Sequence, residues 1–244
     1  MNYKIKVNSV QKENSNIKGF VNVVFGENFK ITNITILDGK NGLYVQMPRY
    51  RTNESDENGK NIYRDFCNPI TKEFREELYG NILKTYESTE FDEMYVGYNQ
   101  GEIPDKLEYE VNVVTFEKEG SSIKGFARVF FGSEFIVNNV SILSSKDTEF
   151  VSMPSYRTNQ VDKDGRAIYQ DVCYPVTKEF KEELYGNILS KYKETKNKNV
   201  VEKDTKDKKT DDFPKANKKA GSKSTKKTKK DEGKEDLTDT PLKR

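Results

Sequence analysis

Arginine provides the side chains in this chain that are best suited to bind a ligand. Four arginines fall in short sequence blocks that occur twice: Arg49, Arg51, Arg64 and Arg157. The planar guanidinium group binds phosphate through two parallel hydrogen bonds and also recognises base edges. We therefore expect these residues to contact nucleic acid. The alternative is that they are solvated surface charges or pair with Asp65 and Asp171.

A second group of basic residues lies in two segments with a helical pattern. Its members are Lys72, Arg75, Lys178 and Lys181. Each segment also carries three glutamates close to its basic residues, which weakens any attraction to phosphate. A role in nucleic-acid binding is a candidate, but a solvated helix surface is the interpretation that we favour.

A third basic group lies near the C-terminal end, where residues 215–230 contain eight lysines and no acidic residue. The candidate contacts there are Lys218, Lys219, Lys226, Lys227, Lys229 and Lys230. A flexible segment of this charge releases counterions when it binds a polyanion, which gives salt-sensitive affinity without sequence preference. It could instead meet anionic lipid, although it lacks the anchor that stable attachment needs. A purely solubilising tail is the remaining alternative.

Tyrosines and cysteines also recur at matching positions. Tyr50, Tyr63, Tyr156 and Tyr169 could stack on unpaired bases, although half-buried positions in a sheet are the more common role. Cys67 and Cys173 are expected to be buried, reduced thiols, with a disulfide between them as the alternative. Two thiols without histidine are too few for a structural zinc site.

The composition argues against an enzyme. The 244 residues include no histidine, which removes the commonest general base and the usual catalytic triads. We expect no catalytic residue, no metal and no cofactor. Residues 1–10 lack the apolar core of a secretory signal, and no run of about 18 apolar residues could cross a bilayer. The expected location is cytoplasmic, without stable membrane insertion and with reduced thiols.

The elements that position these residues come from an internal repeat. A shift of 106 aligns residues 3–86 with residues 109–192, and 44 of the 84 aligned positions are identical. Both copies contain the blocks MPxYRTN, IYxD and CxPxTKEF. This is a tandem duplication of one small domain, whereas a solenoid needs three or more shorter units.

Each copy reads as strands followed by a helix. Residues 3–7 alternate apolar and polar side chains, which is typical of a half-buried strand. Residues 17–25 and 29–37 are rich in β-branched and aromatic side chains and are separated by a short turn, so they predict a hairpin. Asn41-Gly42 is a further turn signal before residues 43–47. Residues 53–60 are polar and predict a loop.

After Pro69 the apolar period changes to that of a helix. Phe74, Leu78, Ile82 and Tyr86 lie four residues apart and form one stripe. Thr71 is the expected N-cap. The helical glycine Gly80, repeated as Gly186, is explained either by close packing or by inheritance from the duplication. A small antiparallel sheet closed by a C-terminal amphipathic helix gives an α+β domain.

The span of the repeat and the composition between and after its copies set the domain boundaries, and the segments differ in charge. Residues 1–86 form copy one, with 13 basic and 10 acidic residues, and 87–108 form an acidic linker, with 1 and 7. Residues 109–195 form copy two, with 11 and 13. Residues 196–244 carry 17 and 10 with almost no apolar side chains, so we expect a disordered, lysine-rich tail.

Several blocks together resemble the SpoVG family of septation proteins (stage V sporulation protein G). They are NGLYVQMPRYRT, YRDFCNP and the closing helix, in that order, and the resemblance covers nearly all of each copy. It implies a small α+β protein that dimerises, binds DNA and RNA, and affects sporulation, asymmetric septation and gene regulation.

This chain departs from the family pattern mainly in copy two. The pair of basic residues after the family's MPS becomes Tyr50-Arg51 and Tyr156-Arg157, and the arginine of its FRD block becomes Gln170 in copy two. The resemblance therefore implies that copy one keeps more of the nucleic-acid surface. If the family unit is a dimer, two fused copies form an intramolecular pseudo-dimer, in which association occurs at high effective concentration.

Two functions follow as expectations. The first is a nucleic-acid-binding regulator linked to sporulation and cell septation, with DNA and RNA both open as ligands. The second is a non-enzymatic adaptor in septum control, whose folded part binds septation or regulatory proteins and no nucleic acid. The slight negative charge of the folded part favours the second.

Overall fold

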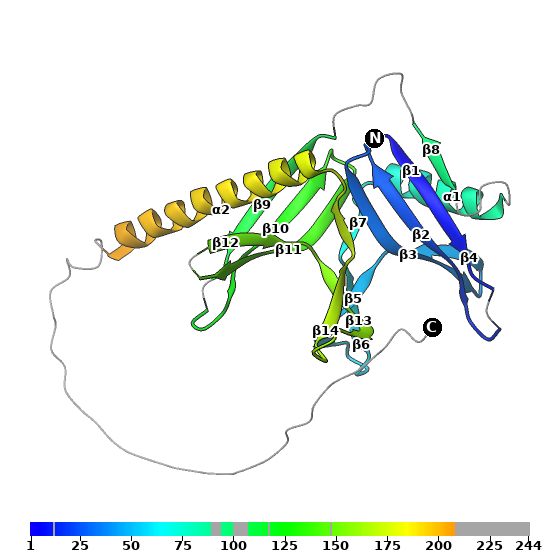
Figure 1. The fold of residues 1–244 in the computed structure, drawn as a ribbon, viewed down its shortest axis with the longest axis horizontal. Helices are drawn as coiled ribbons and strands as arrows, with labels where there is room; N and C mark the ends of the chain where they lie inside the picture. Colours follow the sequence, from blue (N-terminus) through cyan, green and yellow to red (C-terminus); the bar gives the residue numbers. More distant parts are fainter. Residues whose placement is uncertain (12, 89–93, 100–106, 117, 147, 208–244) are drawn as a thin grey trace, which may run out of the picture.

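Two antiparallel sheets, one based on each copy, form the body of the protein (Figure 1). The structure is a computed structural model that describes residues 1–11, 13–88, 94–99, 107–116, 118–146 and 148–207. Copy one supplies β1 (Tyr3–Ser9), β2 (Ile17–Phe25), β3 (Phe29–Gly39), β4 (Gly42–Gln46) and α1 (Lys72–Glu87). Copy two supplies β9 (Tyr109–Thr115), β10 (Ile123–Phe131), β11 (Phe135–Ser145), β12 (Thr148–Ser152) and α2 (Lys178–Asp207). The expected α+β class is confirmed.

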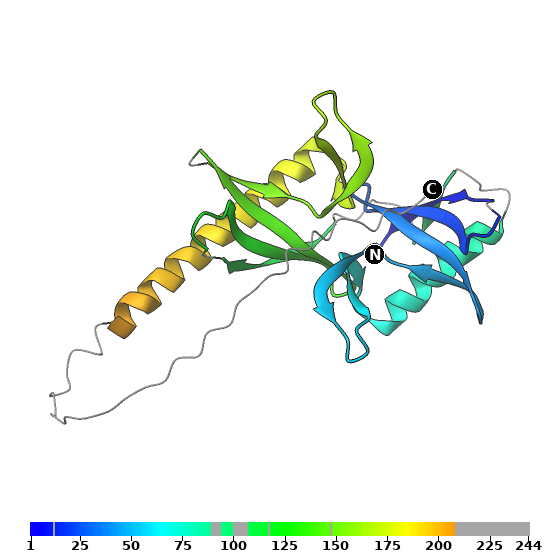
Figure 2. The same ribbon diagram turned by 90° about the horizontal axis from the view of Figure 1, so that it is seen from below.

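The two copies exchange a short strand. β7 (Cys67–Pro69) of copy one pairs with β11, and β15 (Cys173–Pro175) of copy two pairs with β3. The backbone N–H of Asn138 donates to the carbonyl of Phe66 at 2.7 Å, and that of Thr32 donates to Val172 at 2.8 Å. Each copy therefore completes the sheet of the other, about the approximate two-fold axis along which Figure 2 is viewed.

The long third strand of each copy contains a bulge next to the residues that pair with the exchanged strand. Asn33 in β3 and Asn139 in β11 have φ of 59° and 58°, a left-handed conformation that asparagine tolerates better than most residues. The pairing of β2 with β3 shifts register at the same place, between Val21 and Val23. The bulge lies directly beside the backbone groups that bind the incoming segment.

Phenylalanines from both copies form one core across the axis. The side chains of Phe25, Phe29, Phe131 and Phe135 are all fully buried. The ring centroids of Phe29 and Phe131 are 4.6 Å apart, and those of Phe25 and Phe135 are 4.9 Å apart. Because these pairs join residues of different copies, the two halves share a single hydrophobic core.

Each helix packs on one face of the sheet of its own copy. The N–H of Phe74 donates to the side chain of Thr71 at 3.2 Å, and Phe180 makes the same bond to Thr177, which confirms the predicted N-cap. Phe74, Leu78 and Ile82 are buried against the sheet, as their spacing indicates. Within the described residues, neither helix has both the length and the apolar character needed to cross a membrane.

Replacement of Gly80 or Gly186 with alanine is expected to stabilise the protein. Apart from the adjacent residues and the backbone of the same helix, a Cβ atom at either position would meet no atom within 4 Å, so close packing does not explain these glycines. Each substitution should raise the free energy of unfolding by about 0.5–1 kcal/mol, because glycine loses more backbone entropy in a helix than alanine does. Urea denaturation measures the change.

The matched control for these helical variants is Gly125→Ala in β10. A Cβ atom at Gly125 would lie 2.8 Å from the carbonyl oxygen of Val114, so this variant should be destabilised. If Gly80→Ala is also destabilised, the helix surface must be packed in a way that the structure does not show.

The structure also refines the ends of the linker and of copy two. Within the linker, β8 (Tyr95–Tyr98) pairs with β1 and extends the first sheet. The helix α2 continues to Asp207, so the expected boundary at residue 195 falls inside it. There Lys196 pairs with Glu149 at 3.6 Å, and Asn199 donates to the Thr115 hydroxyl at 3.0 Å. These contacts hold the first added turn, residues 196–199, against copy two.

Candidate nucleic-acid interface

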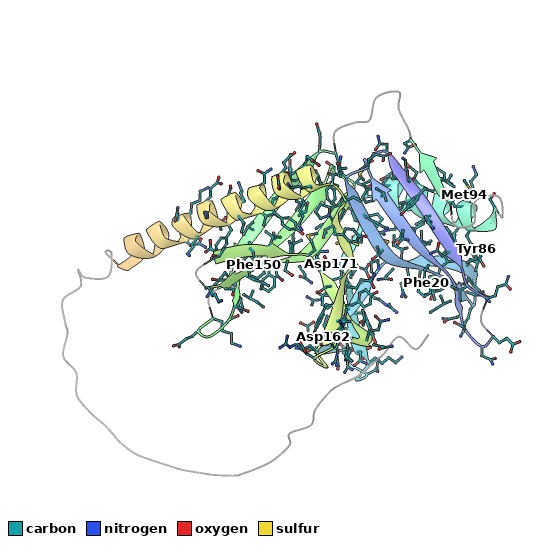
Figure 3. The ribbon with its side chains drawn as sticks, in the orientation of Figure 1. Phe20, Tyr86, Met94, Phe150, Asp162 and Asp171 are labelled. Atoms are coloured by element: carbon teal, nitrogen blue, oxygen red, sulfur yellow. The ribbon has the colours of Figure 1, made fainter. Side chains whose placement is uncertain are left out.

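Two β-ribbons carry the four arginines of the duplicated blocks. One ribbon, arm one, is formed by β5 (Arg49–Ser55) and β6 (Asn61–Asp65), and the other, arm two, by β13 (Ser155–Val161) and β14 (Ala167–Asp171). Both project from the junction of the copies on the same side of the molecule (Figures 1 and 2). Figure 3 shows Asp162 near the free end of arm two and Asp171 near its base.

Backbone hydrogen bonds close the base of each arm. The N–H of Phe66 donates to the carbonyl of Pro48 at 2.9 Å, and the N–H of Val172 donates to Pro154 at 2.8 Å. β7 directly follows arm one, and β15 directly follows arm two. Because each of these strands pairs with the other copy, the exchange of strands fixes the base of both arms. At the tip of arm one, the Asp56 carboxylate accepts hydrogen bonds from the N–H groups of Asn58 and Lys60, a turn that aspartate favours.

One face of arm one brings a tyrosine between two arginines. Arg49 lies opposite Asp65, and Arg51 lies opposite Tyr63, and such cross-strand partners share a face. The Arg49 guanidinium is 4.8 Å from the centroid of the Tyr63 ring, within cation–π distance. The Tyr63 side chain is 44% exposed. This arginine–tyrosine face, Arg49, Arg51 and Tyr63, presents two cations and an aromatic ring to solvent.

The other charged groups of arm one reduce its net attraction for phosphate. Arg64 lies on the opposite face and pairs with Glu54 at 2.9 Å, so its partner is not Asp65. Burial raises the pKa of the Asp65 carboxyl, and the charges of Arg49 and Arg75 partly offset that rise. Tyr50 packs against the Phe66 ring at 4.8 Å, the half-buried role that was the alternative to base stacking.

Arm two has the same backbone but fewer cations near its base. Arg157 lies opposite Tyr169, whose side chain is 63% exposed. Ser155 takes the place of Arg49, and Gln170 accepts a hydrogen bond from the Tyr156 hydroxyl at 2.7 Å. Arm two therefore presents one arginine beside its exposed tyrosine where arm one presents two.

The basic residues of the two helices have local partners. Lys72 pairs with Glu76 at 3.7 Å and Lys178 pairs with Glu182 at 3.8 Å. Arg75 donates to the Pro69 carbonyl at 3.2 Å, and the Lys181 ammonium lies 5.5 Å from the Tyr185 ring centroid. These contacts favour the solvated-surface interpretation. The six candidate lysines of the tail, Lys218 to Lys230, lie outside the described residues.

Both cysteines are buried and unbridged. Burial raises the pKa of the Cys67 thiol, and the neighbouring Cys173 raises it further, so Cys67 stays a neutral thiol in the core. Among the described residues, no group of three or more histidine, cysteine, aspartate or glutamate side chains could hold a metal ion.

A further basic surface lies outside the arginine blocks. Lys4, Lys6 and Lys30 share the uncovered face of the first sheet with Tyr95 and Tyr174. In the sequence, the alternation of apolar and polar residues over 3–7 indicated that Lys4 and Lys6 share the polar face of a strand. Nothing in the sequence could place Tyr174 there, because it reaches this sheet only through the exchanged strand.

Comparison with known proteins identifies a family for both copies. The family model described as SpoVG matches residues 1–88 and again residues 108–194. Proteins named putative septation protein SpoVG match this chain over segments about as long as one copy. The protein of Treponema denticola is 33% identical over 86 residues, 35% of this chain and 85% of that protein.

Two further relatives carry the same name. The protein of Macrococcus caseolyticus is 34% identical over 76 residues, 31% of this chain and 61% of that protein. The protein of Staphylococcus saprophyticus is 28% identical over 86 residues, 35% of this chain and 78% of that protein. The matched segment therefore spans less than two thirds of the length of the Macrococcus protein and more than two thirds of the length of the other two.

Proposed function

Since this chain belongs to the SpoVG family, we propose that it is a nucleic-acid-binding regulator linked to sporulation and cell septation. The link to septation rests on the names of its relatives. Binding of DNA or RNA is what the family resemblance implies, and the arms give that implication a physical basis.

The observation that carries the proposal is the arginine–tyrosine face of arm one. A two-stranded ribbon is narrow enough to enter the major groove of B-DNA. Arg49 and Arg51 can bind phosphate or guanine edges from this face, while Tyr63 can stack on an unpaired base. Residues 49–65 contain four basic and four acidic side chains, so binding by this arm depends on a few local contacts.

The test compares one position in the two arms. Arg51→Ala should weaken binding about tenfold, since one good arginine contact is worth about 1–3 kcal/mol. Arg157→Ala, at the matching position of arm two, should weaken it less. Fluorescence anisotropy with single- and double-stranded DNA and RNA, over a salt series, measures both.

Lys72→Ala is the control for lost charge, because Lys72 is exposed, pairs with Glu76 and lies outside both arms. If Arg51→Ala and Lys72→Ala bind equally well, the arms are not the interface. A chain ending at Asp207, where α2 ends, separates the tail from the folded part. If binding disappears with the tail, the folded copies act through another partner.

A protein-interaction adaptor remains a second candidate because of the uncovered face of copy two. The side chain of Val114 in β9 is 69% exposed, and Phe116 packs edge-on against Phe126 at 5.8 Å between centroids. In the described parts of the chain, the outer edge of β9 pairs with no strand. A protein partner that is recovered equally well after nuclease treatment would favour this function.

A further inference from the structure

The two sheets carry different side chains on the faces that the helices leave uncovered. In β1, Lys4 and Lys6 alternate with the buried side chains of Tyr3, Ile5 and Val7. Since Tyr3 and Ile5 belong to the core, the two lysines lie on the opposite, uncovered face. Five residues define this lysine–tyrosine face: Lys4, Lys6, Lys30, Tyr95 and Tyr174.

Strand register places the five residues in two neighbouring rows. The first row crosses four strands. Lys4 of β1 lies opposite Val24 of β2, and Val24 lies opposite Lys30 of β3. Lys30 lies opposite Tyr174 of β15. In the next row, Lys6 lies opposite Tyr95 of β8. The face therefore combines copy one, the linker and the exchanged strand of copy two.

The two tyrosines approach Lys30 from opposite edges of the sheet. Burial lowers the pKa of Lys30, but interactions with the hydroxyl groups of Tyr95 and Tyr174 outweigh it and leave the pKa raised. Lys30 is therefore a fixed cation at neutral pH. The Tyr95 side chain remains 44% exposed, so its ring is accessible to a ligand that lies on the face.

The positive charge of this face is only partly neutralised. Lys4 pairs with Glu27. Among the described residues, neither Lys6 nor Lys30 forms an ion pair with a carboxylate. The matching positions of copy two hold Glu110, Asn112 and Ile136, and Asn68 takes the place of Tyr174. The combination of three lysines and two tyrosines at these positions is thus specific to the first sheet.

We propose that the lysine–tyrosine face binds single-stranded nucleic acid. Lys6 and Lys30 would bind backbone phosphates, and an unpaired base would stack on the ring of Tyr95. A sheet surface with exposed aromatic rings and basic side chains suits unstacked bases, whereas the bases of a duplex are not free to stack on protein rings. This inference rests on the proposed function and assigns it a ligand class and a second contact surface.

The test replaces the three lysines with the residues that copy two carries at the same places. The variant Lys4→Glu/Lys6→Asn/Lys30→Ile should keep the fold, because the second sheet already has these side chains. Its control, Lys72→Glu/Lys178→Glu, makes the same change in net charge on the two helices. Both are made in the full chain and titrated into a labelled single strand of about 20 nucleotides and into its duplex.

The face variant should bind the single strand about tenfold or more weakly than the control does. A plot of log affinity against log salt concentration should be less steep by about 1.4, since Lys6 and Lys30 each account for about 0.7 in binding to a single strand. Affinity for the duplex should change by a smaller factor.

The aromatic part of the proposal has its own pair of variants. Tyr95→Ala should weaken single-strand binding by about tenfold without altering its salt dependence, because stacking releases no counterions. Tyr95→Phe keeps the ring and should restore most of the affinity. Loss of affinity in both variants would show that the hydroxyl group matters and would overturn base stacking.

The outcomes separate this inference from the proposed function. If the face variant binds like its control while Arg51→Ala loses affinity, the face is not a binding site and the function of the arms stands. If Tyr95→Ala has no effect, and the lysine substitutions weaken binding of heparin and of single strands equally, the face is a general polyanion patch. If the native chain binds neither single strands nor duplexes, both proposals fail.

Discussion

Replacement of Phe131 with alanine should lower the free energy of unfolding by about 3–5 kcal/mol, the usual cost of removing a buried phenylalanine side chain. Phe131 is fully buried, and its ring lies 4.6 Å from Phe29 and 6.4 Å from Phe25, both of the other copy. The cavity would therefore open in the core that the copies share. Both halves should lose stability together, in one transition.

Chemical denaturation followed by circular dichroism and tyrosine fluorescence measures this loss. The control is Phe150→Ala in β12, where the side chain is 43% exposed and truncation should cost less than about 1 kcal/mol. Two separate transitions, with only one shifted in the Phe131 variant, would show that the copies fold independently and would contradict the shared core.

The second large effect is expected when copy one is expressed alone, as residues 1–98. Without copy two, Phe25, Phe29 and the edge of β3 that receives β15 would be exposed. We expect two molecules to form a homodimer by exchanging β7. The residues at the junction allow this because they are identical in both copies: Phe25 and Phe131, Phe29 and Phe135, Cys67 and Cys173, Pro69 and Pro175.

Light scattering coupled to size-exclusion chromatography measures the mass directly. The isolated copy should have twice its sequence mass, and Phe29→Ala in the same fragment should shift it toward unfolded monomer. The intact chain should be monomeric, since its two copies already satisfy each other at high effective concentration. A folded, stable monomer of residues 1–98 would mean that strand exchange is dispensable.

The sequence by itself determined the features that depend on local pattern. The 106-residue repeat, the alternation of residues 3–7, the stripe from Phe74 to Ile82 and the cap at Thr71 all appear in the structure as predicted. Each follows from burial on one side of a regular element, and such burial leaves a period in the sequence. The family assignment is equally local, because short blocks in order carry it.

The sequence also located the arginines but not their surroundings. Arg49, Arg51 and Tyr63 form one face only because the register of β5 and β6 sets them opposite or beside each other. A shift of one residue would place Tyr63 on the other face of the ribbon. The pairing of Arg64 with Glu54 is likewise a consequence of the fold of the arm.

Only the tertiary structure decided how the copies are joined. A strand of three residues, such as Cys67–Pro69, is too short to show a period, and its partner lies about 70 residues away in the other copy. Two glycines illustrate the same limit. Gly80 and Gly125 each recur in the other copy, as Gly186 and Gly19, so the sequence does not distinguish their roles. A Cβ atom at Gly80 would meet open space, whereas one at Gly125 would meet a backbone carbonyl. Tyr174 reaches the lysines of copy one for the same reason: long-range strand pairing, which no local pattern records, brings it there.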